Sequence, residues 1–121
     1  MKRIKLILKK YSSLFYTSIA KSKVKSYKEP FTVNYFSRFT KNTVLGKNTN
    51  FNGMKIAGRG LVTIGDNFHS GSECLLITQN HNYEGEKIPY DSTYIVKKIN
   101  IEDNVWLGNR VIILGGVDRL H

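Results

Sequence analysis

The chain has 121 residues, of which 40% are hydrophobic, and it carries a formal net charge of +10. This length accommodates one domain with a modest core, and the content of aliphatic and aromatic residues excludes an intrinsically disordered chain. The single cysteine cannot form an internal disulfide bond, and no cleavable signal peptide is recognised, so we expect a cytoplasmic protein.

The positive charge is concentrated near the N-terminus. Residues 1–28 hold nine of the 19 lysines and arginines and no acidic residue. The remaining 93 residues carry ten basic and nine acidic side chains, so the body of the chain is close to neutral. The charge excess therefore describes a terminal segment and gives no reason to predict a nucleic-acid-binding protein.

Residues 1–30 are predicted to form a basic amphipathic α-helix, which Pro30 ends. Lysines interrupt every apolar run, so this segment cannot span a bilayer. Two interpretations stay open: the helix packs against the following domain or a neighbouring subunit, or it makes peripheral contact with an anionic membrane surface. Helical spacing places seven apolar side chains on one stripe: Ile4, Ile7, Leu8, Tyr11, Leu14, Phe15 and Ile19.

Residues 31–121 are predicted to form a partial parallel β-helix. A strand from Phe31 to Phe39 is expected to cover its open end. An irregular first turn follows, in which Val44, Ile56 and Val62 recur at a spacing of six or its multiple, with glycines at the corners.

From Ile64 the six-residue spacing becomes regular. Neither the helical period of 3.6 nor the strand period of 2 produces a strict repeat of six with two apolar positions, whereas a chain that alternates flat sides and corners does. The corners are expected at polar and glycine residues such as 102–104, 108–109 and 115–116. The inward positions are Ile64, Phe68, Ser70, Cys74 and Leu76, and then Ile101, Val105, Leu107, Val111, Ile113 and Val117.

The repeat is interrupted once, by a loop excursion over residues 78–100. A solenoid tolerates an insertion at a corner, because each repeat packs only on its neighbours. Long loops in regular architectures are more often functional than accidental. We therefore expect the chemistry of the protein in this excursion.

These features resemble the hexapeptide-repeat acyltransferases, and most closely the sugar and capsular polysaccharide O-acetyltransferases. The resemblance rests on the repeats of residues 64–76, the excursion "ITQNHNYEGEKIPYD" and the motif "IEDNVWLGNRVIILGGV". It implies an all-β fold with a left-handed parallel β-helix and a homotrimer. It also implies transfer of an acetyl group from acetyl-coenzyme A to a hydroxyl of a sugar or polysaccharide, with no metal.

The resemblance makes His81 the catalytic base. A sugar hydroxyl is a poor nucleophile near neutrality, and an imidazole, which titrates near pH ~6.5, can accept its proton during attack on a thioester. Such assistance is worth roughly 10²–10⁴ in rate. The alternative is that His81, which stands between two asparagines, is a polar turn residue.

Further site residues follow from the same resemblance. Trp106 is expected to flank the acyl-donor cleft, and a backbone N–H near Asn109 is expected to stabilise the negative charge on the thioester oxygen. Trp106 can equally be a corner residue that packs on the excursion. Four excursion residues are expected to contact the sugar or, alternatively, to hold the loop to the body: Asn82, Tyr83, Tyr90 and Asp91.

The hexapeptide pattern stops at Val117, whereas family members continue for several more repeats that form much of the coenzyme site. We therefore expect a C-terminally truncated form with an exposed β edge. Two alternatives to an active acetyltransferase stay open. One is a catalytically impaired remnant of such an enzyme, and the other is a peripheral membrane-binding module that acts through residues 1–28.

Overall fold

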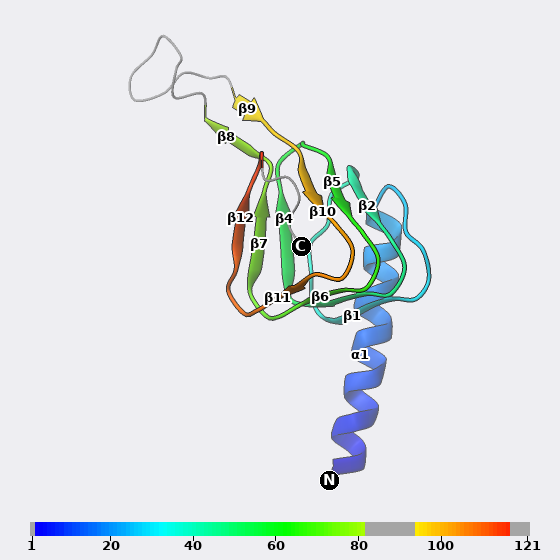
Figure 1. The fold of residues 1–121 in the computed structure, drawn as a ribbon. Coiled ribbons are helices and arrows are strands. Elements are labelled where there is room, and N and C mark those ends of the chain that lie inside the picture. The colour runs from blue at the N-terminus through cyan, green and yellow to red at the C-terminus, as the bar shows by residue number, and fades with distance from the viewer. Residues whose placement is uncertain (1, 82–93, 117–121) are drawn as a thin grey trace.

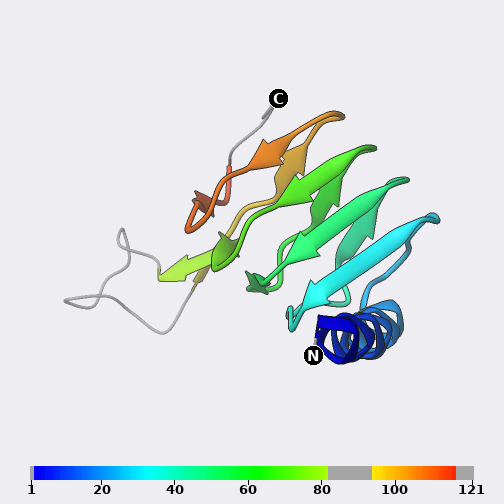
Figure 2. The ribbon, with the colours of Figure 1, turned by 90° about the horizontal axis from the view of Figure 1, so that it is seen from below.

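The structure, a computed structural model, describes residues 2–81 and 94–116. Within these ranges the chain forms one helix, α1 (Lys2–Lys23), followed by β strands, most of which lie in three parallel sheets. The sheets surround a common interior, and α1 lies beside β1 at one end of the molecule (Figures 1 and 2). The prediction of a mostly-β chain with an N-terminal helix is confirmed, although the helix is shorter than residues 1–30.

The chain contributes strands to the three sheets in a fixed order, and all neighbouring strands in them are parallel. Sheet A contains β2 (Thr43–Leu45), β5 (Val62–Ile64) and β10 (Ile99–Ile101). Sheet B contains β1 (Phe31–Tyr35), β3 (Thr49–Asn52), β6 (Phe68–Ser70) and β11 (Trp106–Leu107). Sheet C contains β4 (Met54–Ala57), β7 (Cys74–Ile77) and β12 (Ile112–Leu114). We call β2–β4, β5–β7 and β10–β12 the first, second and third rounds.

The six-residue spacing corresponds to the inward positions of these short strands. Ile64, Ser70 and Leu76 are all buried, and so are Phe68 and Cys74, as predicted. Alternate residues of a strand face opposite sides, so a strand of three with inward ends places two side chains in the interior. The prediction was wrong for Val44, which faces outward between buried Thr43 and Leu45. The spacing of six is interrupted in the first round, so the sequence did not reveal that the inward positions shift there by one residue.

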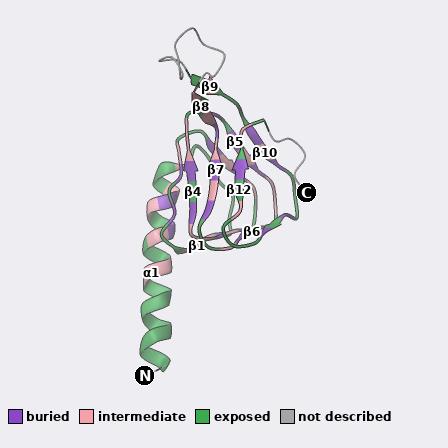
Figure 3. Ribbon diagram, turned by 90° about the vertical axis from the view of Figure 1, so that its left-hand side faces the viewer, coloured by how far each residue is buried: buried purple, intermediate pink, exposed green. Residues whose placement is uncertain are grey.

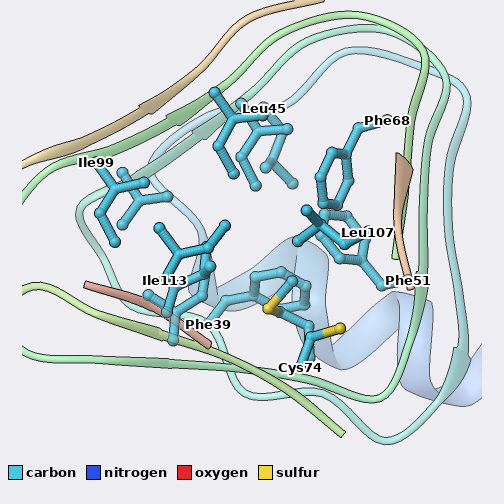
Figure 4. Packing of buried hydrophobic residues seen from close by; sticks show 14 of the residues in the cluster. Phe39, Leu45, Phe51, Phe68, Cys74, Ile99, Leu107 and Ile113 are labelled. Carbon is cyan, nitrogen blue, oxygen red and sulfur yellow. The ribbon is translucent and has the colours of Figure 1, made fainter. Parts of the chain in front are cut away.

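The interior combines a cluster of aromatic rings with aliphatic side chains (Figure 4). Phe51 is fully buried and contacts the rings of Phe31, Phe39 and Phe68, with centroid distances of 5.8, 4.9 and 5.3 Å. Edge-to-face and tilted ring pairs of this kind each add about 0.5–1.5 kcal/mol beyond area burial. The aromatic cluster therefore stabilises the part of the body on which α1 packs.

Asparagine and aspartate side chains join the rounds at the corner between sheets A and B. Asn48, Asn67 and Asn104 all have positive φ, near 60°, a conformation that asparagine tolerates better than most residues. The amide of Asn67 accepts from Asn48 at 3.1 Å and donates to Asn104 at 2.9 Å. Beside them, the carboxylate of Asp103 accepts the backbone N–H of Asp66 at 2.7 Å. The predicted corner at residues 102–104 is confirmed.

Helix α1 packs on β1 mainly through small residues. The hydroxyl of Thr17 accepts the backbone N–H of Val33 at 2.8 Å, and Ala20 is buried. The apolar stripe predicted from the sequence does not make this contact, because most of its residues are more than half exposed.

Candidate active site

The excursion leaves and rejoins the body at a hydrogen-bonded crossing between sheets C and A. Thr78, which is fully buried, follows β7, and its carbonyl accepts the backbone N–H of Lys97 at 2.8 Å. Its hydroxyl donates to the carbonyl of Ala57 at 3.0 Å and accepts the N–H of Gly60 at 2.9 Å. Both ends of the excursion are therefore fixed to the body at one point.

Three glycines make room for this crossing. A Cβ on Gly58 would lie 2.8 Å from the Cβ of Gln79, and one on Gly60 would lie 2.6 Å from the Cβ of Thr78. A Cβ on Gly115 would lie 2.6 Å from the carbonyl oxygen of Lys97. Contacts this short require the backbone to move, so the sequence keeps glycine where the excursion passes. Sequence reasoning identified these glycines only as corners.

Beyond the crossing, the excursion begins as an antiparallel ribbon of β8 (Gln79–His81) and β9 (Tyr94–Val96). The ribbon extends away from the three sheets (Figure 1). The excursion predicted over residues 78–100 begins with this ribbon, but it ends earlier than predicted, because Ile99 and Asn100 already belong to β10 in sheet A. The predicted sugar contacts Asn82, Tyr83, Tyr90 and Asp91 lie outside the described residues.

His81 stands at the outer end of β8 and pairs with Tyr94 of β9. Their ring centroids are 4.9 Å apart, with an angle of 30° between the planes. The backbone N–H of His81 donates to the side-chain oxygen of Asn80 at 2.8 Å. The side chain of His81 is half-buried, and its Nδ1 atom is shielded from solvent. The imidazole is therefore held against the ribbon, outside the interior that the sheets enclose.

A pocket of about 130 Å³ lies at the base of this ribbon. Its walls are mostly apolar, and one cation, Lys97, lines it. Asn80, which precedes His81, also lines it. The guanidinium of Arg59 lies near the same base, where its Nε donates to Gln79 at 3.2 Å. The complete lining is Ile77, Thr78, Gln79, Asn80, Ile95, Lys97, Leu114 and Gly115.

The two residues expected at the acyl donor lie elsewhere in the chain. Trp106 is on the outer face of sheet B, 77% exposed, with its ring centroid 5.9 Å from that of His69. Asn109 is at the corner between β11 and β12, and its side-chain oxygen accepts the backbone N–H of Ser72 at 2.8 Å. Figure 1 shows β11 on the side of the molecule opposite the ribbon. A single chain therefore does not bring Trp106 to His81.

Sequence reasoning missed the polar row to which His69 belongs. On the outer face of sheet B, Asn34 donates to Asn52 at 3.0 Å, and the amide of Asn52 lies 3.4 Å from Nε2 of His69. These residues lie on β1, β3 and β6 but are offset from direct register, since His69 pairs with Asn50 and Asn52 with Tyr35. The row therefore becomes visible only once the strand pairing is known.

The described residues include no group of three or more His, Cys, Asp or Glu side chains placed to bind a metal ion. No helix in the described part of the chain is long and apolar enough to cross a bilayer.

Comparison of the chain with protein-family models, with curated proteins and with solved structures gives no match. A functional assignment therefore depends on the residues and their arrangement alone.

Proposed function

We propose that the chain is a hexapeptide-repeat acyltransferase with a left-handed parallel β-helix, which transfers an acetyl group from acetyl-coenzyme A to a hydroxyl of a sugar or polysaccharide. One observation carries the proposal. Strands enter three parallel sheets in the same order over three rounds, and the excursion that bears His81 is inserted between the second and third rounds. The sequence resemblance predicts a histidine at this place in the repeat.

His81 is the general base of the proposed reaction. Its ring is held by Tyr94 and by the ribbon, so it can accept the proton of an acceptor hydroxyl as that oxygen attacks the acyl carbonyl. The protonated imidazole then returns the proton to the departing thiolate. The bond that forms joins the sugar oxygen to the acyl carbon, and the bond that breaks is the thioester.

The pocket beside the ribbon suits the acyl-bearing arm of coenzyme A. Its apolar wall of Ile77, Ile95 and Leu114 fits the alkyl part of a pantetheine chain. Lys97 and Arg59 supply positive charge near the same base, as expected for a phosphate-bearing donor. The donor supplies the activated carbonyl, and these residues hold and orient it.

We further propose that a complete site combines residues of two copies in a homotrimer. Trp106 is on β11, on the side of the chain opposite the ribbon, so it can serve the same site only from a neighbour. The outer face of sheet C supports such an assembly. Ile112 pairs with Leu75 and Leu114 with Ile77, and the two third-round residues are more than half exposed. Burial of this apolar face by another copy would place two chains beside the ribbon.

An acetyl-transfer assay with acetyl-coenzyme A and a panel of sugars tests the activity. His81→Ala should lower kcat by roughly 10²–10⁴. Lys41→Ala is the control, because Lys41 is an exposed residue in the turn before β2, and it should retain activity. Equal activity of the wild type and His81→Ala would remove His81 from the mechanism.

Mixing two inactive variants tests the shared site. His81→Ala and Trp106→Ala chains, refolded together, should form some sites that hold both native residues and regain activity. Each variant refolded alone should not. Absence of recovery in mixed trimers would mean that Trp106 does not serve the site of a neighbouring copy.

A further inference from the structure

About half of helix α1 projects beyond the body of the protein. Its 22 residues correspond to about 33 Å at 1.5 Å per residue. Residues 2–11 are exposed on every side, and the first buried residue is Thr17 (Figure 3). An isolated helical segment of this length is marginal in water, so the projecting half gains from a surface on which to lie.

An exposed apolar stripe runs along the projecting half of α1 and continues to Phe15. Its members repeat at helical spacing and are each between 52% and 66% exposed: Ile4, Ile7, Leu8, Tyr11, Leu14 and Phe15. From Ile4 to Phe15 the stripe extends about 16 Å along the helix. It is too regular to be a scatter of single surface hydrophobic residues.

The stripe faces away from the body. The side that packs on β1 is formed by Ser13, Thr17 and Ala20, with hydrogen bonds from Ser13 to Asn34 and from Val33 to Thr17. At about 100° per residue, the mean directions of this side and of the stripe differ by roughly 150°. A flat surface can therefore meet the whole stripe without touching the β sheets.

The charges of the helix select the kind of surface. Arg3 and Lys10 flank the stripe on one side and Lys5 on the other, and α1 contains no acidic residue. A second copy of the same helix would bring these cations together, which disfavours pairing between helices. An anionic surface would instead neutralise them, with their alkyl stems lying along the apolar layer.

We propose that α1 docks on the surface of an anionic lipid bilayer. The stripe enters the boundary between headgroups and acyl chains, the flanking cations contact lipid phosphates, and the β sheets remain on the aqueous side. This inference is independent of the proposed acetyltransferase activity. It places the proposed activity next to a membrane.

Vesicle flotation of the full chain tests the docking. Wild-type protein should float with vesicles of equal parts phosphatidylcholine and phosphatidylglycerol, and not with pure phosphatidylcholine. High salt should weaken the binding, because exposed charges are screened. Lys5→Gln combined with Lys10→Gln should lower affinity by about thirtyfold, at about 1 kcal/mol per cation and a factor of ten per 1.4 kcal/mol.

Two leucines provide a matched pair for the apolar stripe. Leu8 lies in the stripe and Leu6 lies outside it, and they are 61% and 67% exposed. Leu8→Gln should weaken vesicle binding by about tenfold, whereas Leu6→Gln should change it little. Circular dichroism of both variants should show unchanged helix content.

Three outcomes would overturn the proposal. The first is no flotation with anionic vesicles. The second is equal binding of the Leu8→Gln and Leu6→Gln variants, which would reduce the interaction to charge alone. The third is loss of oligomers in Leu8→Gln by light scattering without loss of vesicle binding, which would assign the stripe to a second copy.

Discussion

The imidazole of His81 lies against the phenol ring of Tyr94, with 4.9 Å between the ring centroids and 30° between the ring planes. The two residues are 13 positions apart in sequence and meet because β8 and β9 pair in antiparallel register. Tyr94 thus orients the proposed base and does not itself need to contact the acceptor.

Loss of the Tyr94 ring should lower turnover without removing the base. A tilted ring contact is worth about 0.5–1.5 kcal/mol, so Tyr94→Ala should reduce kcat by about threefold to tenfold. Val96→Ala is the control, since Val96 lies on the same strand and is similarly exposed, at 44% against 46%. Steady-state kinetics should show a lower kcat with an unchanged KM in Tyr94→Ala alone. Equal kinetics of the two variants would contradict a positioning role.

Two glycine substitutions test whether the crossing at the base of the excursion is packed more tightly than another corner. Gly58 has a φ of +100°, and a Cβ there would meet Gln79, whereas a Cβ on Gly108 would meet nothing within 4 Å. Gly58→Ala should cost at least about 1 kcal/mol in the free energy of unfolding. Gly108→Ala should be neutral or stabilise by up to about 1 kcal/mol, because it restricts the unfolded chain. Urea unfolding of both variants measures the difference, and equal stabilities would contradict the tight crossing.

The repeat made most of the β structure predictable. Inward residues recur every six positions, so the sequence identified Phe68, Cys74 and Leu76 as core without any knowledge of strand pairing. The same reasoning failed at Val44, where an irregular corner shifts the phase by one residue. In a strand, a shift of one residue turns every side chain to the other face.

The arrangement of the site was less predictable. The sequence placed His81 on an excursion, but its contact with Tyr94 depends on pairing across a long segment of chain. The packed face of α1 was also not predictable from the sequence. The sequence left open whether the apolar stripe packs on the body or meets another surface. In the structure Thr17 and Ala20 pack on β1 instead, because their small side chains let the helix approach closely. Which side of a helix meets a partner is a property of both surfaces.

The ion pair between Lys21 and Glu29 should give a pH-dependent contribution to stability. The two groups are 2.8 Å apart, and the hydrogen bond from Lys21 lowers the pKa of Glu29 below its ordinary value near 4.5. The same bond raises the pKa of Lys21 above 10.5. The contribution of Glu29 is therefore present above pH 4.5 and is lost as the pH falls through its lowered pKa. That of Lys21 is present below pH 10.5 and is lost as the pH rises through its raised pKa.

Urea midpoints measured across the acidic range should show this dependence. Lys21→Gln should flatten the part of the acid profile that Glu29 contributes, and Lys23→Gln, an exposed lysine of the same helix, should leave the profile unchanged. The effect should be small, because the carboxylate is 63% exposed and solvent screens the pair. Identical acid profiles of the wild type and Lys21→Gln would mean that the pair contributes nothing in solution.

Two fully buried threonines should respond oppositely to the same substitution. The hydroxyl of Thr78 donates to the carbonyl of Ala57 and accepts the N–H of Gly60. Thr78→Val would leave the buried N–H of Gly60 without this partner, whereas the carbonyl of Ala57 would keep its bond from the backbone N–H of Thr78, at 2.9 Å. The hydroxyl of Thr49 has no hydrogen-bond partner among the described residues. Valine has nearly the shape of threonine, so the comparison isolates the hydroxyl group.

Thr78→Val should therefore lower the free energy of unfolding by about 1–3 kcal/mol, the cost of leaving one buried donor, the N–H of Gly60, unpaired. Thr49→Val should be neutral or stabilising by about 1 kcal/mol, since it removes a buried hydroxyl that forms no bond. Urea unfolding with equal m values would show that both variants keep the same native compactness. In Thr78→Val the base of the excursion should also open more often, and faster amide exchange at Lys97 would report this. Equal losses of unfolding free energy at both positions would show that the hydroxyl of Thr78 does not fix the base of the excursion.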